Sequence, residues 1–217
     1  MMSPLIHLHP QEKPKAPNSR MPYRHAVAWR PNLGGSDGIK PAVSIFVTQK
    51  AFLGFCAHAL TDLYNEVGGW MLGKWRTDGR SGEQFIVIDT VLPALHTQHG
   101  NAFLTFTQDS QVALYNLIQT EYPKKDLVGW FHTHPRMGVF LSAYDTWLHD
   151  HFFPEIWQVA LVIEPFSNTG GFFIRQPDSR LDPRKYFGFN ELVYKKDRSV
   201  VDWRNYVTTP LMTEQES

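Results

Sequence analysis

Cysteine is nearly absent from this sequence, because Cys56 is its single cysteine. An intrachain disulfide framework is therefore excluded, and a metal site in the chain must draw on histidine and carboxylate ligands. Cys56 lies in the segment FLGFCAHALTDLY. We interpret it as a small buried apolar residue rather than a nucleophile.

An excess of charge of one sign and long apolar runs are also missing. Lysine plus arginine and aspartate plus glutamate number 21 each, so no basic surplus indicates a nucleic acid or an anionic membrane. No apolar run reaches the roughly 20 residues that a membrane span needs, and the N-terminus lacks the apolar core of a secretory signal. We therefore expect a cytoplasmic protein with neither nucleic acid nor membrane as a partner.

The composition is that of a folded domain, since 42% of the 217 residues are hydrophobic and 14% are aromatic. Residues 1–40 are rich in proline, glycine and polar residues, and they predict a flexible or peripherally docked N-terminal arm. Residues 41–177 carry the patterned sequence and predict one domain. Residues 178–217 are charged and weakly periodic, and they predict a C-terminal extension of unknown role.

The domain alternates between two kinds of hydrophobic pattern. Short apolar runs predict strands at 42–49, 67–75, 83–95, 101–107, 126–134, 157–165 and 171–176. Apolar stripes with helical spacing predict helices at 50–64, 109–122 and 143–153. Asp109 or Ser110 is the expected N-cap of the second helix. Because strands and helices interleave, we expect an α/β fold with one central mixed β-sheet.

The string HTHP at 132–135 ends a predicted strand. Residues i and i+2 of a strand point to the same side, so the imidazoles of His132 and His134 can reach one ion. A helix that starts near Ser142 presents Asp145 from its first turn. His132, His134 and Asp145 then make three ligands for zinc and leave the fourth tetrahedral position to water, as in catalytic sites.

The same residues have plainer interpretations. Ser142 and Asp145 also fit an ordinary helix-capping pattern that needs no metal. An HxH pair in an average protein is more often incidental than metal-binding. The chain carries a second copy of the string at His7 and His9, but no strand precedes it and no Ser-x-x-Asp follows it. We assign that copy no function.

The order and spacing of the residues around the HTHP string at 132–135 resemble the JAMM motif of the MPN+ (JAB/MPN/Mov34) metallopeptidases. That motif has a distant upstream Glu, then HxHP, six residues, Ser, two residues and Asp, and each of these intervals matches. The upstream Glu corresponds to Glu66 in EVGGWMLG, which is similar to the family's strand entry. The resemblance covers about residues 42–176 and implies a three-layer α-β-α fold with a central mixed β-sheet, the MPN or cytidine-deaminase-like arrangement.

The resemblance implies a zinc metallopeptidase with one catalytic zinc ion held by His132, His134 and Asp145. Glu66 would be the general base that takes a proton from water and passes it to the leaving amine. Ser142 would donate a hydrogen bond to the oxyanion of the tetrahedral intermediate. Without the motif, Glu66 would be interpreted as a solvated carboxylate at a helix end.

Residues beside the motif have mostly structural interpretations. Trp130 and Phe131 flank the metal-binding strand and are expected to pack it in the core. Gly68 and Gly69 either allow a close approach of backbone beside the site or form a bulge.

The remaining histidines near the motif are not expected to bind metal. His96 and His99 are expected in a polar loop rather than at a second metal. His149 and His151 diverge on a predicted helix, and we expect both on the surface.

JAMM proteins with an intact motif typically cleave after the C-terminal Gly-Gly of ubiquitin or a ubiquitin-like protein. An extended tail without side chains can add to a sheet edge and bring its last carbonyl to the metal. In the family this edge often lies before the second helix, which corresponds here to about Pro93–Thr107. Within that segment we expect Phe103–Phe106 to contact the tail of the substrate.

The stretch 138–165 is similar to bacterial JAB-type proteins, many of which act beside ubiquitin-like, E1-like and E2-like proteins, including antiphage systems. The resemblance therefore implies a peptidase or isopeptidase of a bacterial ubiquitin-like pathway, with E1-like and E2-like proteins as further partners. One alternative is a JAMM peptidase that trims a sulfur-carrier protein. Another is a noncatalytic MPN scaffold, which the intact ligand set disfavours.

Overall fold

The structure, a computed structural model, describes residues 15–32, 38–94, 108–194 and 198–209. Its helices are α1 (Gln49–Ala59), α2 (Gln108–Glu121) and α3 (Ala143–Phe152), with a 3-10 turn at Tyr23–His25. Its strands are β1 (Asn18–Ser19), β2 (Ala26–Pro31), β3 (Ser44–Thr48), β4 (Gly68–Asp78), β5 (Gln84–Pro93), β6 (Asp126–Thr133), β7 (Val159–Glu164), β8 (Thr169–Phe173), β9 (Phe189–Leu192) and β10 (Tyr206–Thr209).

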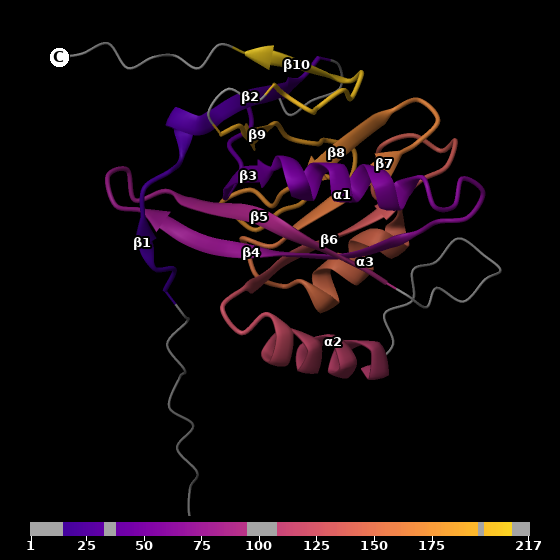
Figure 1. Cartoon of the computed structure of the whole chain (residues 1–217), viewed down its shortest axis with the longest axis horizontal. Helices are drawn as coiled ribbons and strands as arrows, with labels where there is room; N and C mark the ends of the chain where they lie inside the picture. The colour runs from indigo at the N-terminus through magenta and orange to yellow at the C-terminus, as the bar shows by residue number, and fades with distance from the viewer. Residues whose placement is uncertain (1–14, 33–37, 95–107, 195–197, 210–217) are drawn as a thin grey trace, which may run out of the picture.

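The strands form one sheet in the order β10-β2-β9-β3-β5-β4-β6-β7-β8, with the short β1 paired to β4. The pairs β3–β5, β3–β9, β6–β7 and β1–β4 are parallel, and the other pairs are antiparallel. The sheet is therefore mixed, and the predicted α/β fold class is confirmed (Figure 1).

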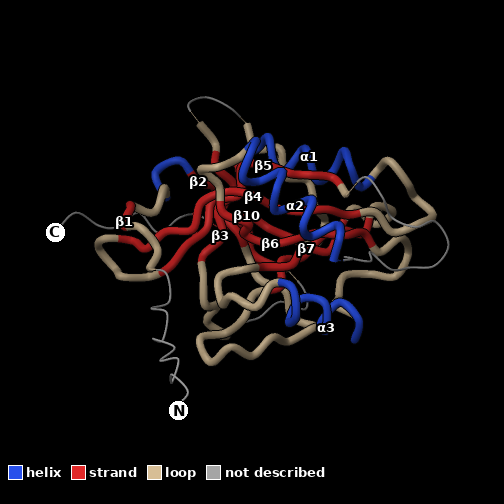
Figure 2. Tube along the Cα trace, turned by 90° about the horizontal axis from the view of Figure 1, so that it is seen from below, coloured by secondary structure: helices blue, strands red, loops and turns tan. Residues whose placement is uncertain are grey.

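Helices cover both faces of the sheet, as consecutive residues of β6 show. The Phe131 ring lies 5.3 Å from the ring of Phe55 on α1, whereas Trp130 donates a hydrogen bond to His149 on α3. Since neighbouring strand residues point to opposite faces, α1 and α3 lie on opposite sides of the sheet. Figure 2 shows the strands between these two helices.

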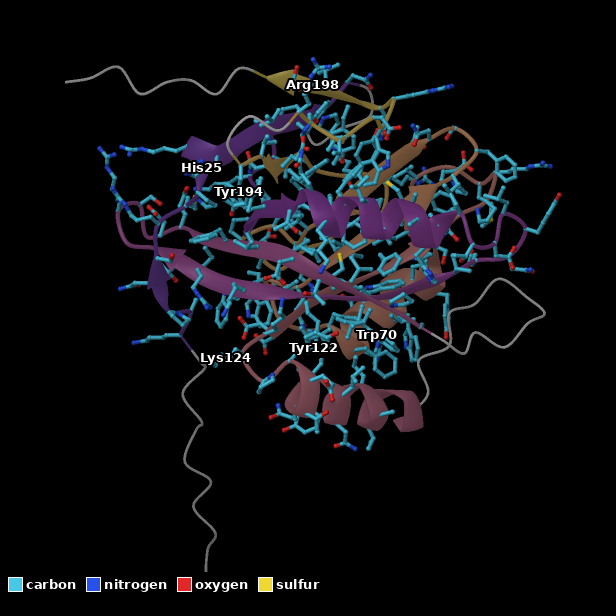
Figure 3. All side chains as sticks on the ribbon, viewed as in Figure 1. His25, Trp70, Tyr122, Lys124, Tyr194 and Arg198 are labelled. Atoms are coloured by element: carbon cyan, nitrogen blue, oxygen red, sulfur yellow. The ribbon has the colours of Figure 1, made fainter. Side chains whose placement is uncertain are left out.

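Helix α2 covers another part of the sheet through a small apolar cluster. Leu114 and Ile118 of the helix pack against Leu72 of β4. Trp70 and Tyr122 join the edge of this cluster, on the side of the sheet where α2 lies (Figure 3). The helix begins at Gln108, so the prediction of Asp109 or Ser110 as its N-cap is wrong.

The order of the predicted elements is confirmed for β3 to α3, β7 and β8, apart from the predicted strand 101–107, which lies outside the described residues. The flanks of the predicted domain are different. Strand β2, at Ala26–Pro31, pairs with β10 and with β9 inside the sheet. The prediction of a flexible arm is therefore wrong for this strand, whose Ala28 and Trp29 are buried. The described part of 178–217 contributes β9 and β10 to the same sheet.

The carboxylate of Glu191 connects these flanking segments through hydrogen bonds. It is buried and accepts hydrogen bonds from the Trp29 indole at 3.1 Å, the Gln49 amide at 2.8 Å and the backbone N–H of Val200 at 2.8 Å. Four donors, including the Ser199 hydroxyl, satisfy this buried carboxylate, as burial of a charge requires. The two flanks and α1 are thus joined at one side chain. No helix among the described residues is long and apolar enough to cross a membrane.

Candidate metal centre

The end of strand β6 places both histidines of the HTHP string on one side of the sheet. His132 pairs with Gly68 of β4 and Val162 of β7, and it is 1% exposed. His134 lies just beyond the strand, yet its N–H still donates to Ile163 O at 2.9 Å, and it is 2% exposed. The alternation expected from a strand therefore holds through both residues. Their Nε2 atoms are 2.9 Å apart.

Helix α3 presents Asp145 to this pair from its first turn. The Ser142 Oγ accepts a hydrogen bond from Asp145 N at 3.1 Å, and Asp145 Oδ2 accepts one from Ser142 N at 2.7 Å. This reciprocal arrangement is a complete capping box. The same carboxylate also faces the imidazoles, so the capping and metal-binding interpretations of Ser-x-x-Asp are compatible.

The donor set suits a zinc ion. Asp145 Oδ1 lies 3.4 Å from His132 Nε2, and Oδ2 lies 3.5 Å from His134 Nε2. Zinc–ligand bonds of about 2.0–2.2 Å in a tetrahedron put two ligand atoms about 3.3–3.6 Å apart. The two carboxylate–imidazole distances match this spacing, whereas the imidazole pair is closer because its nitrogens share a hydrogen bond. His132, His134 and Asp145 could therefore hold one metal ion.

The protonation states of His132 and Asp145 also favour metal binding. Burial lowers the pKa of His132 below its ordinary value, which keeps the ring neutral. Burial raises the pKa of Asp145, but hydrogen bonding to His132 and His134 outweighs burial and lowers it. A neutral imidazole and an ionised carboxylate are the forms that bind a metal.

Glu66 approaches the same three residues from the segment before β4. Its Oε1 lies 3.8 Å from His134 Nε2, and its side chain is 9% exposed. Burial, opposed by His134 and helped by Asp145, raises the pKa of Glu66 to about 7. The carboxylate is therefore close to the proposed ligands without belonging to the group of three that could hold the ion.

Thr133, between the two histidines, connects the Glu66 segment to strand β6 by two hydrogen bonds. Its Oγ1 accepts a hydrogen bond from Val67 N at 2.9 Å, and its own N–H donates to Val67 O at 2.8 Å. Val67 follows Glu66 directly, so Glu66 is held in register with His132 and His134. Asp62 shapes the preceding turn by accepting from the N–H groups of Tyr64 and Asn65.

The close-approach interpretation of the glycine pair is correct for Gly69. A Cβ at this position would lie 2.1 Å from Leu92 O and 3.0 Å from the Phe131 ring. The irregularities of β4 fall at 71–73 instead. Gly69 therefore lets β5 and the core side of β6 come close to the strand entry beside Glu66.

Glu164 is a residue near the site that the sequence did not single out. The loop after His134 turns back through positive φ angles at Arg136, 61°, and Gly138, 88°. Glu164 Oε1 accepts from Arg136 N at 3.0 Å and thereby fixes the start of this loop. Burial raises the pKa of Glu164, but hydrogen bonds from Ser167 and from backbone N–H groups lower it overall. The one sequence signal was a carboxylate that ends a fully apolar strand.

One prediction about histidines is wrong. His149 is fully buried, whereas His151 is exposed as expected. The reason is a pair of partners far from α3 in sequence: Trp130 Nε1 lies 3.1 Å from His149 Nδ1, and Arg175 Nη1 lies 2.8 Å from its Nε2. Trp130 is buried in the core, as predicted, and also stacks on His132.

Several expected positions lie outside the described residues: His7, His9, His96, His99 and Phe103–Phe106. Cys56 is half-buried on α1. Burial, helped by Asp202, raises the pKa of its thiol to about 11. The thiol stays protonated at neutral pH, which agrees with its interpretation as a packing residue.

Comparison with known proteins gives the family. The model of the JAB1/Mov34/MPN/PAD-1 ubiquitin protease family matches residues 41–154, slightly more than half of the chain. COP9 signalosome complex subunit 5 of Candida albicans is 28% identical over 142 residues, which are 63% of this chain and 22% of that protein. The chain thus spans about a fifth of the length of this relative.

A solution structure of a protein from Desulfitobacterium hafniense is also similar, with a TM-score of 0.46 and 25% sequence identity. That similarity covers 65% of this chain and 90% of the other. The family match includes the segment before β4, strand β6 and helix α3, which together carry the site. The chain belongs to the JAB1/Mov34/MPN/PAD-1 family, which includes metallopeptidases.

Proposed function

We propose that this chain is a zinc-dependent isopeptidase or peptidase that cleaves after the C-terminal glycine of a ubiquitin-like protein. One observation carries the proposal. The imidazoles of His132 and His134 and the carboxylates of Asp145 and Glu66 converge from three parts of the fold, with contacts of 2.9 to 3.8 Å. Family membership supports this class of reaction, and the convergence supports the residue roles proposed below.

His132, His134 and Asp145 hold the zinc ion. When bound, zinc lowers the pKa of a coordinated water towards about 7 and polarises a carbonyl oxygen. The three protein ligands leave one tetrahedral position open, as catalytic zinc sites do. The presence of all three ligands disfavours a noncatalytic scaffold.

Glu66 moves the proton. As the oxygen of the attacking water bonds to the carbonyl carbon, the Glu66 carboxylate accepts a proton from that water. It then gives the proton to the leaving nitrogen while the carbon–nitrogen bond breaks. The products are the glycine carboxylate and a free amine. The two hydrogen bonds of Thr133 to Val67 fix the position of the neighbouring Glu66 relative to the ligands.

Ser142 stabilises the oxyanion. Its Oγ uses a lone pair to cap α3, accepting from Asp145 N. A hydroxyl group carries one hydrogen besides its lone pairs, so the oxygen that caps the helix can also donate a hydrogen bond to the oxyanion. Cap and catalytic donor are therefore the same atom, held by the first turn of the helix.

The proposed substrate class rests on the family, which is described as a ubiquitin protease family. An extended tail with no side chains can lie along a sheet edge and deliver its last carbonyl to the site. The bacterial pathway, its E1-like and E2-like partners and the antiphage role stay predictions from the resemblance, and the cytoplasmic location stays a prediction from the sequence pattern. Processing of a sulfur-carrier protein stays the alternative, since it uses the same bond cleavage.

The test uses two substrates: a ubiquitin-like protein fused through Gly-Gly to a peptide, and the same protein joined to a lysine side chain. We expect the wild type to cleave at least one of them and a zinc chelator to stop the reaction. Glu66→Gln should be inactive yet keep its zinc, because Glu66 is not a ligand.

Glu83→Gln is the matched control, since Glu83 pairs with Lys40 on the exposed surface, and it should cleave like the wild type. Cysteine-directed inhibitors should have no effect. Cleavage by Glu66→Gln at the rate of the wild type would reject Glu66 as the base. Cleavage of the linear fusion alone would favour precursor processing, and cleavage of the lysine adduct would favour deconjugation.

A further inference from the structure

Among the described residues, the ring of His132 lacks the hydrogen bond that usually orients a metal-binding histidine. A metal-binding histidine almost always donates its second ring N–H to a carboxylate, a carbonyl or a water, and this bond fixes the plane of the ring. The Nδ1 of His132 is buried and has no hydrogen-bond partner among the described residues. A different contact must therefore set the ring plane.

Trp130 supplies a contact of the right shape. It lies two residues before His132 on β6 and points to the same face of the sheet. The two rings are nearly parallel, with an interplanar angle of 8° and 4.6 Å between centroids. Trp130 is fully buried, so the indole covers one face of the His132 ring with little freedom to move.

The indole is itself held from the other side by α3. Trp130 Nε1 donates to His149 Nδ1 at 3.1 Å, and both rings stack on Phe153 with centroids 6.0 Å away. An indole N–H can only donate, so Nδ1 of His149 must carry a lone pair. Burial and the Arg175 guanidinium lower the pKa of His149 well below its ordinary value, which keeps that lone pair available.

Arg175 of the segment after β8 completes the arrangement. Its Nη1 donates to Phe153 O at 2.9 Å. Its Nη2 lies 2.9 Å from Asp150 Oδ1 and 3.3 Å from His149 O. Arg175 is 4% exposed, and these bonds fix the guanidinium and, through it, the end of α3.

We propose that Trp130 is a positioning residue for His132, held in place by His149 and Arg175. Stacking on a hydrogen-bonded indole fixes the ring plane of His132. In most metal-binding histidines, a hydrogen bond to Nδ1 fixes that plane. The proposal rests on the proposed zinc site. It assigns a role in metal binding to two residues, Trp130 and His149, that the reaction itself does not use.

The test measures the zinc dissociation constant by competition with a chelator, and the visible spectrum of the cobalt-substituted protein. Trp130→Phe keeps a ring but loses the N–H, and we expect zinc affinity to fall about 10-fold. His149→Leu should lower the zinc affinity by a similar factor. His149→Gln keeps a hydrogen-bond acceptor and should restore the zinc affinity. The double variant Trp130→Phe with His149→Leu should bind zinc no more weakly than either single variant, because both changes break the same chain of contacts.

Trp203→Phe is the matched control for the loss of a buried indole. Trp203 is 2% exposed and packs on Phe52, Phe172, Phe189 and Tyr206 rather than on the ligands. It should lower the unfolding temperature of the zinc-free chain as Trp130→Phe does, and leave zinc affinity and the cobalt spectrum unchanged.

The results separate this inference from the proposed function. A wild type that binds no zinc would reject both. Two results would overturn the positioning role alone, in a wild type that binds zinc. One is that Trp130→Phe binds zinc with the affinity of the wild type, and the other is that Trp203→Phe loses as much zinc affinity as Trp130→Phe.

Discussion

The two faces of strand β6 are equally buried but differ in what their side chains do. On the face towards α3, Trp130 and His132 stack, and His132 belongs to the group of three residues that could hold a metal ion. On the face towards α1, Phe131 packs on Phe55, and Thr133 binds the backbone of Val67. All four β6 residues are 0 or 1% exposed, so burial alone does not distinguish a ligand from a core residue. Their partners do.

The comparison also separates two tasks. The α1 face fixes where the strand lies and where the Glu66 segment enters, through Phe131 and Thr133. The α3 face holds the groups that would bind zinc. If this division is correct, substitutions on one face should change stability or alignment, and those on the other should change metal binding or turnover.

The largest effect on stability is expected from Phe131→Ala. Removing a buried phenyl ring costs about 3–5 kcal/mol, because it loses apolar burial and leaves a cavity. Urea unfolding should show this loss, while the folded fraction still binds zinc. A stable Phe131→Ala protein that has lost zinc would contradict the division between the faces.

Ser142→Ala sharpens the comparison at the site itself. We expect kcat to fall about 100- to 1000-fold through loss of the oxyanion donor, and stability to fall about 1 kcal/mol through loss of the cap. Zinc affinity should not change. Thr48→Ala is the control, since Thr48 caps α1 in the same way and should cost similar stability without loss of kcat. Equal kcat values for both variants would remove Ser142 from the reaction.

A smaller effect is expected from Thr133→Val. This change keeps the shape of the side chain but leaves the Val67 N–H without its acceptor, at a cost of about 1–3 kcal/mol. Since Val67 carries Glu66, kcat should fall while zinc affinity stays the same. Thr133→Ser keeps the hydroxyl and should recover most of the rate. A loss of zinc in Thr133→Val would show that this residue acts on the ligands instead.

The smallest effect is expected at Asp78, at the end of β4. Its pKa is lowered, as is that of Asp145 at the site, but Asp78 lies away from the proposed ligands. Backbone hydrogen bonds from Ser81 and Met21 lower the pKa of Asp78 to about 2, below its ordinary value of about 3.9. Asp78 therefore stabilises the fold fully above its unfolded pKa, and this contribution is lost as the pH falls through about 2.

Urea unfolding of the wild type and of Asp78→Asn between pH 6 and pH 2 should show this dependence. The stability gap should be present at pH 6 and close towards pH 2. Zinc binding at neutral pH should be equal in the two proteins, because Asp78 contacts the N-terminal segment at Met21 rather than the ligands. A gap that does not change with pH would contradict this assignment.

The sequence predicted the parts of the fold whose signals are local. Alternation and helical spacing identified the elements from β3 to β8, and the HTHP string with Ser142 and Asp145 identified the residues that converge. It missed β2, β9 and β10. Strand β2 pairs with residues at least 160 positions away, and Phe189–Leu192 contains a buried Asn190 and a buried Glu191. No local period marks such a strand.

His149 was missed for a related reason. Its surroundings in sequence, LHDHFF, are polar enough for a helix surface, and its partners Trp130 and Arg175 lie 19 and 26 residues away. Burial there comes from the way α3 crosses the face of β6, which spacing alone does not predict. The sequence offered two interpretations of Ser142 and Asp145, a helix cap or part of a metal site. The fold allows both at once, because Asp145 closes the capping box and also faces the two histidines.

The zinc content of the dialysed protein tests the central claim most directly. The wild type should retain one zinc ion per chain, His132→Gln none, and His151→Gln, which changes an exposed histidine on α3, one. A zinc-free wild type, or a His132→Gln protein that keeps its full zinc content, would contradict the account.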